Sequence, residues 1–149
     1  MMKKAILGIS LAVLFGTTAR ADEVELAPST LVAIRKAGYD LQGANLGDIK
    51  RAVEAKATDV KPFKQNAEAI LAWAKVIPDL FPEGTEKDTK ALPAVWSDRA
   101  GFTKAATALA TAAESLVKAA DANDPAAFGA AFKATGEACG GCHRPYRAK

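Results

Sequence analysis

Apolar residues recur every three to four positions in four separate stretches of this 149-residue chain, and no stretch has the strict alternation of a half-buried β-strand. The pattern predicts helices over about 31–56, 62–77, 97–120 and from 125 to near the C-terminus. Turns at two of the junctions are short, which favours neighbouring helices that run antiparallel. The sequence therefore predicts an all-α fold, an antiparallel four-helix bundle.

Prolines, glycines and capping residues suggest where these helices begin and end. Pro28-Ser29-Thr30 provides a start for the first helix, and the glycines between 43 and 47 allow a break within it. Ser97 is the expected N-cap of the third helix, and Asp124-Pro125 gives an N-cap and a first-position proline for the fourth. Segment 78–96, which joins the second and third predicted helices and contains prolines and charged residues, is expected to be a long surface connection.

Near its C-terminus the chain carries a C-x-x-C-H motif, Cys139-Gly140-Gly141-Cys142-His143, which is the signature of covalent c-type haem attachment. Both thiols would add to the haem vinyl groups, and the imidazole of His143 would be the axial iron ligand. On a helix these three side chains share one face because they are separated by three and four positions. Phe128 and Phe132 continue this spacing, so we expect the single haem to face the same core as they do.

A cysteine pair at this spacing has other interpretations. A thioredoxin-like redox pair should follow a strand in a βαβ unit, whereas the residues before Cys139 are rich in alanine. A zinc site needs four ligands, and the chain holds two cysteines and one histidine in total. An ordinary disulfide is the remaining alternative. Haem attachment is the interpretation that the adjacent histidine favours.

The N-terminus has the layout of a cleavable secretory signal peptide. Lys3 and Lys4 precede an apolar run from Ala5 to Phe15, and Ala19-Arg20-Ala21 provides an A-x-A cleavage site. The run is too short to span a bilayer, and no longer apolar stretch follows. We therefore expect residues 1–21 to be removed and residues 22–149 to form one domain in the periplasm, with no attachment to the membrane after cleavage.

The charge of the chain gives no reason to expect nucleic-acid binding. The formal net charge of +3 is accounted for by Lys3, Lys4 and Arg20, because the signal peptide contains no acidic residue. Residues 22–149 carry equal numbers of basic and acidic side chains. No Ser/His/Asp set can form when the single histidine binds iron, and no phosphate-binding glycine loop is present, so the sequence predicts no enzyme and no catalytic residue.

Three segments give the chain a resemblance to a known family. The C-terminal residues 139–147 read CGGCHRPYR, residues 92–98 read LPAVWSD, and residues 35–39 read RKAGY. With four helices and haem attachment near the C-terminus, the chain resembles cytochrome c', the class II c-type cytochromes, over essentially all of residues 22–149. The resemblance implies a cytochrome c'-like four-helix bundle domain with one covalent haem c per chain.

The family divides according to the residue that faces the open side of the iron, and Tyr39 occupies that position here. Methionine, the sixth ligand of low-spin members, occurs only at positions 1 and 2, and His143 is already the proximal ligand. A neutral phenol with an ordinary pKa of about 10 is a poor iron ligand. The resemblance therefore implies five-coordinate, high-spin iron that binds NO and CO, transfers single electrons to an unknown redox partner, or does both.

The resemblance also assigns two cationic residues to the haem. Arg35, one turn before Tyr39, matches an arginine that approaches a haem propionate, and Arg147 matches one beside the proximal imidazole. Pro145 disfavours the last helical turn and leaves the position of Arg147 open. Family members often form homodimers through their first two helices.

Two rival functions stay open. In the first, a lysine or Tyr39 completes the coordination of a low-spin electron carrier. In the second, Cys139 and Cys142 belong to a periplasmic thiol-disulfide oxidoreductase.

Overall fold

The computed structural model describes residues 26–149, and the signal peptide predicted at 1–21 lies outside this range. Four long helices form the body of the protein: α1 (Pro28–Glu54), α2 (Lys64–Val76), α4 (Arg99–Asp121) and α5 (Pro125–Tyr146). A short helix α3 (Ala94–Ser97) and two 3-10 turns, η1 (Lys61–Phe63) and η2 (Pro78–Leu80), lie in the connections. Within the described residues no strand is formed, and a single antiparallel bridge joins Ala91 to Arg147.

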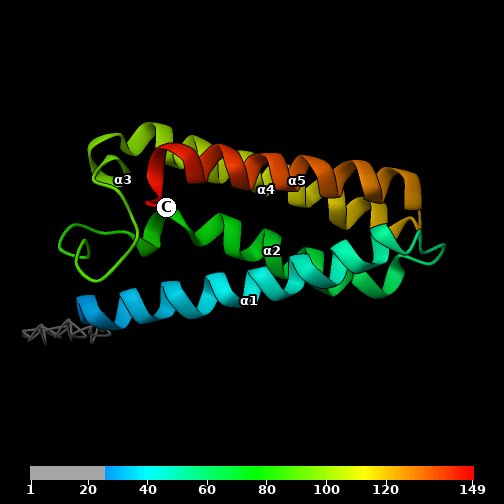
Figure 1. Ribbon diagram of the computed structural model, residues 1–149, viewed down its shortest axis with the longest axis horizontal. Helices are drawn as coiled ribbons and strands as arrows, with labels where there is room; N and C mark the ends of the chain where they lie inside the picture. The colour runs from blue at the N-terminus through cyan, green and yellow to red at the C-terminus, as the bar shows by residue number, and fades with distance from the viewer. Residues whose placement is uncertain (1–25) are drawn as a thin grey trace, which may run out of the picture.

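The four long helices run alternately in opposite directions, so the predicted antiparallel four-helix bundle is confirmed (Figure 1). Within the bundle α2 packs against α1 and α4, and α5 packs along α4. The contact between α5 and α1 is much smaller. The α1–α2 and α4–α5 connections lie at one end of the bundle, and the long α2–α4 connection and the C-terminus lie at the other (Figure 1).

The N-cap of α5 follows the local sequence signal, and the N-cap of α4 does not. Asp124 caps α5 as predicted, because its Oδ1 accepts hydrogen bonds of 3.0 Å from the backbone N–H groups of Ala126 and Ala127. The prediction that Ser97 caps the third helix is wrong. Ser97 ends α3, and the next residue, Asp98, caps α4 by accepting a 3.1 Å hydrogen bond from Gly101 N.

The first helix is continuous, and no break occurs between residues 43 and 47. Packing compensates for the low helix propensity of its glycines, since α1 packs against α2 and Ile49 on its inner face is completely buried. A long unbroken α1 carries residues 35–46 along one side of the bundle. It therefore provides one complete wall of the cavity described below.

The core consists of two apolar clusters. The larger cluster includes Ile49, Leu116 and Phe128, each fully buried, and Phe132 packs against it. The smaller cluster includes Phe81, Val95, Phe102 and Tyr146, and Cys142 packs against it. The two clusters occupy successive stretches of the bundle, so α5 presents its phenylalanines to one and its C-terminal turns to the other. The cavity described below is lined by members of both clusters, such as Ile70 and Phe81, so the expectation that the haem faces the same core as Phe128 and Phe132 stays a prediction.

Residues 78–93, which we call the strap, lie within the segment 78–96 that was expected to be a surface connection, and this expectation is only partly correct. Glu83 and Glu86 are exposed, but Phe81 and Thr85 are buried. Side chains from outside the strap bind its carbonyl groups: Trp96 Nε1 donates to Pro82 O at 3.0 Å, and an arginine of α4 donates to the carbonyls of residues 78 and 81. The strap is therefore an ordered wall of the protein.

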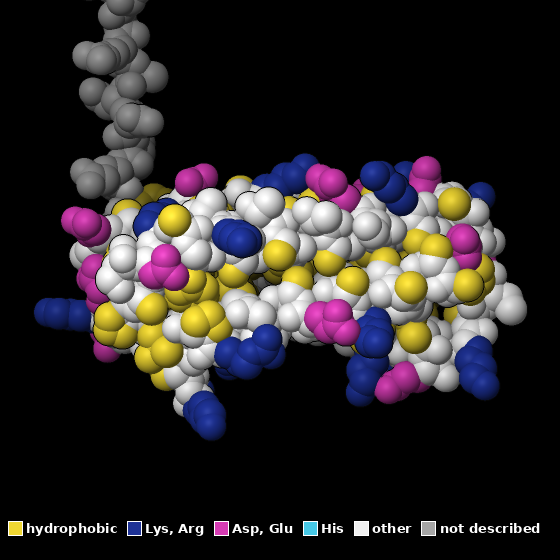
Figure 2. All heavy atoms as spheres, turned by 90° about the horizontal axis from the view of Figure 1, so that it is seen from above, with side chains coloured by type: hydrophobic (Ala, Val, Ile, Leu, Met, Phe, Trp, Pro, Cys, Tyr) yellow, Lys and Arg dark blue, Asp and Glu magenta, His cyan; other side chains and the backbone are white. Residues whose placement is uncertain are grey.

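The surface seen in Figure 2 carries lysine, arginine and acidic side chains interspersed along the bundle, without a large patch of one sign. Several of the exposed charges form ion pairs within or between helices, such as the 2.6 Å contact between Lys64 Nζ and Asp121 Oδ1. Such exposed pairs contribute little to stability. None of the helices in residues 26–149 combines the length and the apolar character needed to cross a membrane.

Candidate haem site

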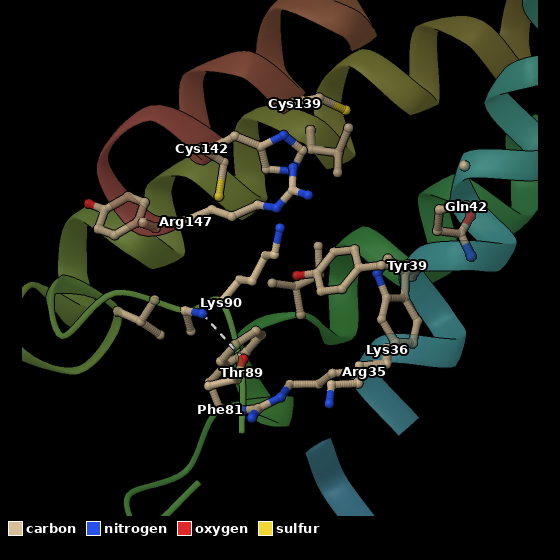
Figure 3. Close-up of a pocket in the computed structure, with 18 of the residues that line it drawn as sticks. Arg35, Lys36, Tyr39, Gln42, Phe81, Thr89, Lys90, Cys139, Cys142 and Arg147 are labelled. Atoms are coloured by element: carbon tan, nitrogen blue, oxygen red, sulfur yellow. Dashed lines mark hydrogen bonds between the residues drawn. The ribbon is translucent and has the colours of Figure 1, made fainter. Parts of the chain in front are cut away.

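A cavity of about 610 Å³ lies between α1 and α5, and α2, α4 and the strap complete its walls. All six residues predicted to contact the haem line this cavity: Arg35, Tyr39, Cys139, Cys142, His143 and Arg147. They come from opposite ends of the sequence, and the bundle brings them together because α1 and α5 are neighbours (Figures 1 and 3). The volume falls within the range of pockets for small molecules and cofactors.

The α5 wall carries the attachment motif. Cys139, Cys142 and His143 lie in one uninterrupted helical segment, and neither cysteine forms a disulfide. Cys142 points into the cavity in Figure 3. Burial, followed by the nearby positive charge of Arg147, lowers the pKa of His143 below its ordinary value. The imidazole is therefore neutral at neutral pH, which is the form that binds a metal ion.

The environment of the two thiols does not resemble that of a redox-active pair. Burial raises the pKa of both Cys139 and Cys142 above the ordinary value for a thiol. Cysteines of thiol-disulfide oxidoreductases have a lowered pKa, because the thiolate is the nucleophile. Both cysteines also lie well inside α5 rather than at the start of a helix after a strand. Their surroundings favour attachment chemistry over thiol exchange.

Tyr39 lies on the opposite wall, on α1. Its ring meets Trp73 of α2 edge to face, with 5.5 Å between ring centroids and 82° between ring planes. In Figure 3 its hydroxyl points into the cavity, toward the side that holds Cys142. Burial raises the pKa of Tyr39 well above its ordinary value, so the phenol stays protonated at neutral pH.

Trp73 reaches its position because α1 has a glycine, Gly38, at the point of closest approach. A Cβ atom added to Gly38 would overlap the six-membered ring of Trp73. Trp73 also lines the cavity, and its indole nitrogen is buried without a hydrogen-bond partner in the structure. The structure thus places this tryptophan between Gly38 and the cavity.

Arg35 is neither at the surface nor free. It is 2% exposed, its Nη1 donates to Thr85 Oγ1 at 2.9 Å and to Leu80 O at 3.3 Å, and its Nη2 donates to Thr85 O at 2.7 Å. The guanidinium also lies over the Phe81 ring at 4.2 Å. Nε of Arg35 is the nitrogen left without a partner. Contact between Arg35 and a haem propionate stays a prediction, for which Nε–H and the second N–H of Nη2 are the available donors.

The last turn of α5 is well defined despite Pro145. The helix continues through the proline to Tyr146, whose hydroxyl donates a 2.7 Å hydrogen bond to Asp98 Oδ2. Gly101 leaves room for this contact, since a Cβ atom there would meet both groups. Arg147 then leaves the helix in an extended conformation and lines the cavity. The structure therefore resolves the position of Arg147 that the sequence left open.

Two lysines at the cavity, Lys36 and Lys90, were not identified from the sequence. Lys36 is adjacent to Arg35 and carries no motif of its own. Lys90 is brought to the cavity by backbone pairing between the strap and the C-terminal segment, where Ala148 N donates to Lys90 O at 2.8 Å. Residues so far apart in the sequence give no local signal of such pairing.

The cavity has the chemical character that a haem requires. Its walls are mainly apolar, with aromatic residues from α1, α2, α4 and the strap. Two thiols and one neutral imidazole share one wall, and two buried donors, Arg35 Nε and Trp73 Nε1, have no hydrogen-bond partner among residues 26–149. A flat apolar group with carboxylate substituents satisfies each of these features. The residues present therefore fit a covalently attached haem.

Comparisons with known proteins point in the same direction. Residues 30–147 match the family model described as cytochrome c'. The chain is 34% identical over 125 residues to cytochrome c' of Rubrivivax gelatinosus, which covers 82% of this chain and 97% of that protein.

Solved structures of cytochrome c' are also similar to this chain. A nitric oxide complex of a cytochrome c' variant from Alcaligenes xylosoxidans is 32% identical, with a TM-score of 0.77 over 84% of this chain and 99% of that chain. A cytochrome c' described as having ligand-controlled dimer dissociation is 30% identical, with a TM-score of 0.78 and the same coverage of both chains.

Proposed function

Because the chain belongs to the cytochrome c' family, we propose that it is a periplasmic protein with five-coordinate, high-spin haem iron that binds NO and CO, transfers single electrons, or does both. The family carries covalently bound haem c, and this chain has the two cysteines for its attachment. When bound, the haem supplies an open iron position for a diatomic gas and a one-electron redox centre. We assign no enzymatic activity to the protein.

The observation that carries this proposal is the asymmetry of the two cavity walls. On α5, His143 offers a neutral imidazole beside the two cysteines. On α1, Tyr39 is the facing side chain, and its raised pKa keeps the phenol protonated. A protonated phenol is a poor metal ligand, whereas neutral imidazole is a good one. The chain thus provides a strong ligand on one side and a covering side chain on the other.

Each residue of the site has a role in this proposal. Cys139 and Cys142 hold the haem through thioether bonds, and His143 binds the iron. Tyr39, braced by Trp73, limits the size of what can approach the open side and has a hydroxyl that can donate a hydrogen bond. The mainly apolar lining of the cavity favours small uncharged molecules.

The relatives support the choice of gas and the possibility of a dimer. One structural neighbour is a complex with nitric oxide, and another shows ligand-controlled dimer dissociation. In this chain Ile34, Leu41 and Val76 are exposed apolar residues on α1 and α2. Exposed apolar side chains on these two helices suit a homodimer contact. Export to the periplasm rests on the signal-peptide pattern of residues 1–21.

The test is the visible absorption spectrum of the purified ferrous protein before and after addition of CO. We expect a broad high-spin Soret band that sharpens when CO binds. The variant Tyr39→Met is the matched control, because it supplies a thioether at the same position and should give a low-spin spectrum. A wild-type spectrum that is already low-spin and unaffected by CO would contradict the proposal. Free-thiol titration completes the test, and two reactive thiols would favour the oxidoreductase alternative.

A further inference from the structure

The cavity contains an excess of positive charge that the protein itself does not balance. Arg35, Lys36, Lys90 and Arg147 line it together with one carboxylate, Asp40. Among residues 26–149, none of these five side chains takes part in an ion pair. Arg35 is buried, whereas Lys36, Lys90, Arg147 and Asp40 are exposed, so these four charges lie at the open edge of the cavity. An excess of cations at this edge favours a ligand with negative charge.

Two of the cations are brought together by backbone contacts. The bridge between Ala91 and Arg147 is closed by hydrogen bonds from Leu92 N to Tyr146 O at 3.0 Å and from Ala148 N to Lys90 O at 2.8 Å. In Figure 3 the ammonium group of Lys90 points into the cavity toward the side chain of Arg147. The fold thus holds two like charges on the same side of the cavity, where they repel each other unless an anion lies between them.

Arg35 has fewer free hydrogen-bond donors for an anionic ligand than Lys90 has. Arg35 Nη1 donates to Thr85 and Leu80 and its Nη2 donates once to Thr85, so only Nε–H and one N–H of Nη2 remain for a ligand. These same bonds hold the strap against α1, and the strap carries Lys90. By contrast, Lys90 has three ammonium donors and no side-chain partner among the described residues. The more available cation is therefore on the strap.

We propose that Lys90, together with Arg147, binds a propionate carboxylate of the haem. The ammonium and the guanidinium provide charge-assisted hydrogen bonds to one carboxylate group, and the bridge between the strap and the C-terminal segment fixes their spacing. Lys90 acts as a charged ammonium, which has no lone pair and cannot be an iron ligand. This inference rests on the proposed function, since it requires the haem to be present.

The test compares the reduction midpoint potential of the haem in wild type and in Lys90→Gln, measured by spectroelectrochemistry. Loss of a positive charge beside the haem favours the ferric state, so the potential should fall. We expect a roughly threefold to tenfold change in the reduction equilibrium constant, where tenfold corresponds to about 59 mV for one electron. Lys87→Gln is the matched control, since Lys87 is exposed on the same strap and does not line the cavity. Lys90→Arg should restore most of the potential.

Each other result has a definite meaning. Equal potentials for Lys90→Gln and wild type, with covalent haem and a high-spin spectrum in both, would overturn this inference and leave the proposed function standing. A Lys90→Gln effect seen in acetate and lost in an acetate-free buffer of equal ionic strength would overturn it by showing that the pair binds a free anion. A change in iron coordination in Lys90→Gln would overturn it by making Lys90 an iron ligand. Wild type without covalent haem would overturn both proposals.

Discussion

Replacing Gly38 with alanine tests how closely α1 and α2 approach beside the cavity. A methyl group at this position would overlap the six-membered ring of Trp73, so the indole or the helix must shift. Overpacking of this kind costs about 1–3 kcal/mol. Alanine also gains about 1 kcal/mol over glycine in a helix interior. The net change in the free energy of unfolding should lie between about zero and a loss of 2 kcal/mol.

The matched control is Gly47→Ala on the same helix. There the added Cβ would meet only Arg51 Nη1 at 3.8 Å, an ordinary contact, and Gly47 does not line the cavity. Gly47→Ala should therefore show the propensity gain alone, about 0.5–1 kcal/mol. The difference between the two variants isolates the packing term, about 1–3 kcal/mol.

Urea denaturation of the haem-containing protein measures both changes, and equal slopes would confirm that only stability differs. Combining Gly38→Ala with Trp73→Phe completes a double-mutant cycle, because phenylalanine is too short to reach the added methyl group. The penalty at Gly38 should shrink in that background. If Gly38→Ala stabilises the protein as much as Gly47→Ala does, the proposed closeness of the two helices is refuted.

Three further predictions concern the cavity and its supports. Tyr39→Ala should raise the CO association rate constant roughly twofold to tenfold, because the wild-type ring must give up an edge contact of about 0.5–1.5 kcal/mol to move aside. Tyr39→Phe should change this rate constant little. Equal rate constants for Tyr39→Ala and wild type in stopped-flow measurements would exclude obstruction by the ring. Arg35→Gln should lower the free energy of unfolding in urea by about 2–3 kcal/mol, since the strap loses its charge-assisted hydrogen bonds, and an unchanged value would contradict the role given to Arg35. The hydrogen bond to Asp98 raises the pKa of Tyr146 to about 12, so the stabilising effect of this bond is complete below pH 10 and is lost as pH rises through 12. Between pH 10 and 12 the melting temperature of Tyr146→Phe should therefore fall less steeply than that of wild type. Parallel curves of melting temperature against pH would refute the linkage.

At the start of α4 the capping residue differs from the one that the sequence predicts. Ser97 and Asp98 are both good capping residues, and the sequence favoured Ser97. The short helix α3 occupies residues up to Ser97, which leaves Asp98 with the non-helical backbone that a cap requires. Asp98 then also accepts the hydroxyl of Tyr146, a residue 48 positions away. The capping residue is thus selected by contacts with α3 and α5, which no local sequence pattern encodes.

By itself the sequence determined the four helices, the Asp124 cap and the motif at residues 139–143, because each depends on spacing or capping within a few residues of the chain. The tertiary structure alone decided that Arg35 binds the strap rather than solvent, and that Lys90 and Arg147 share one side of the cavity. These contacts join residues about 50 positions apart. They form only when the packing of the bundle fixes which helix faces meet, and that packing depends on many side chains at once.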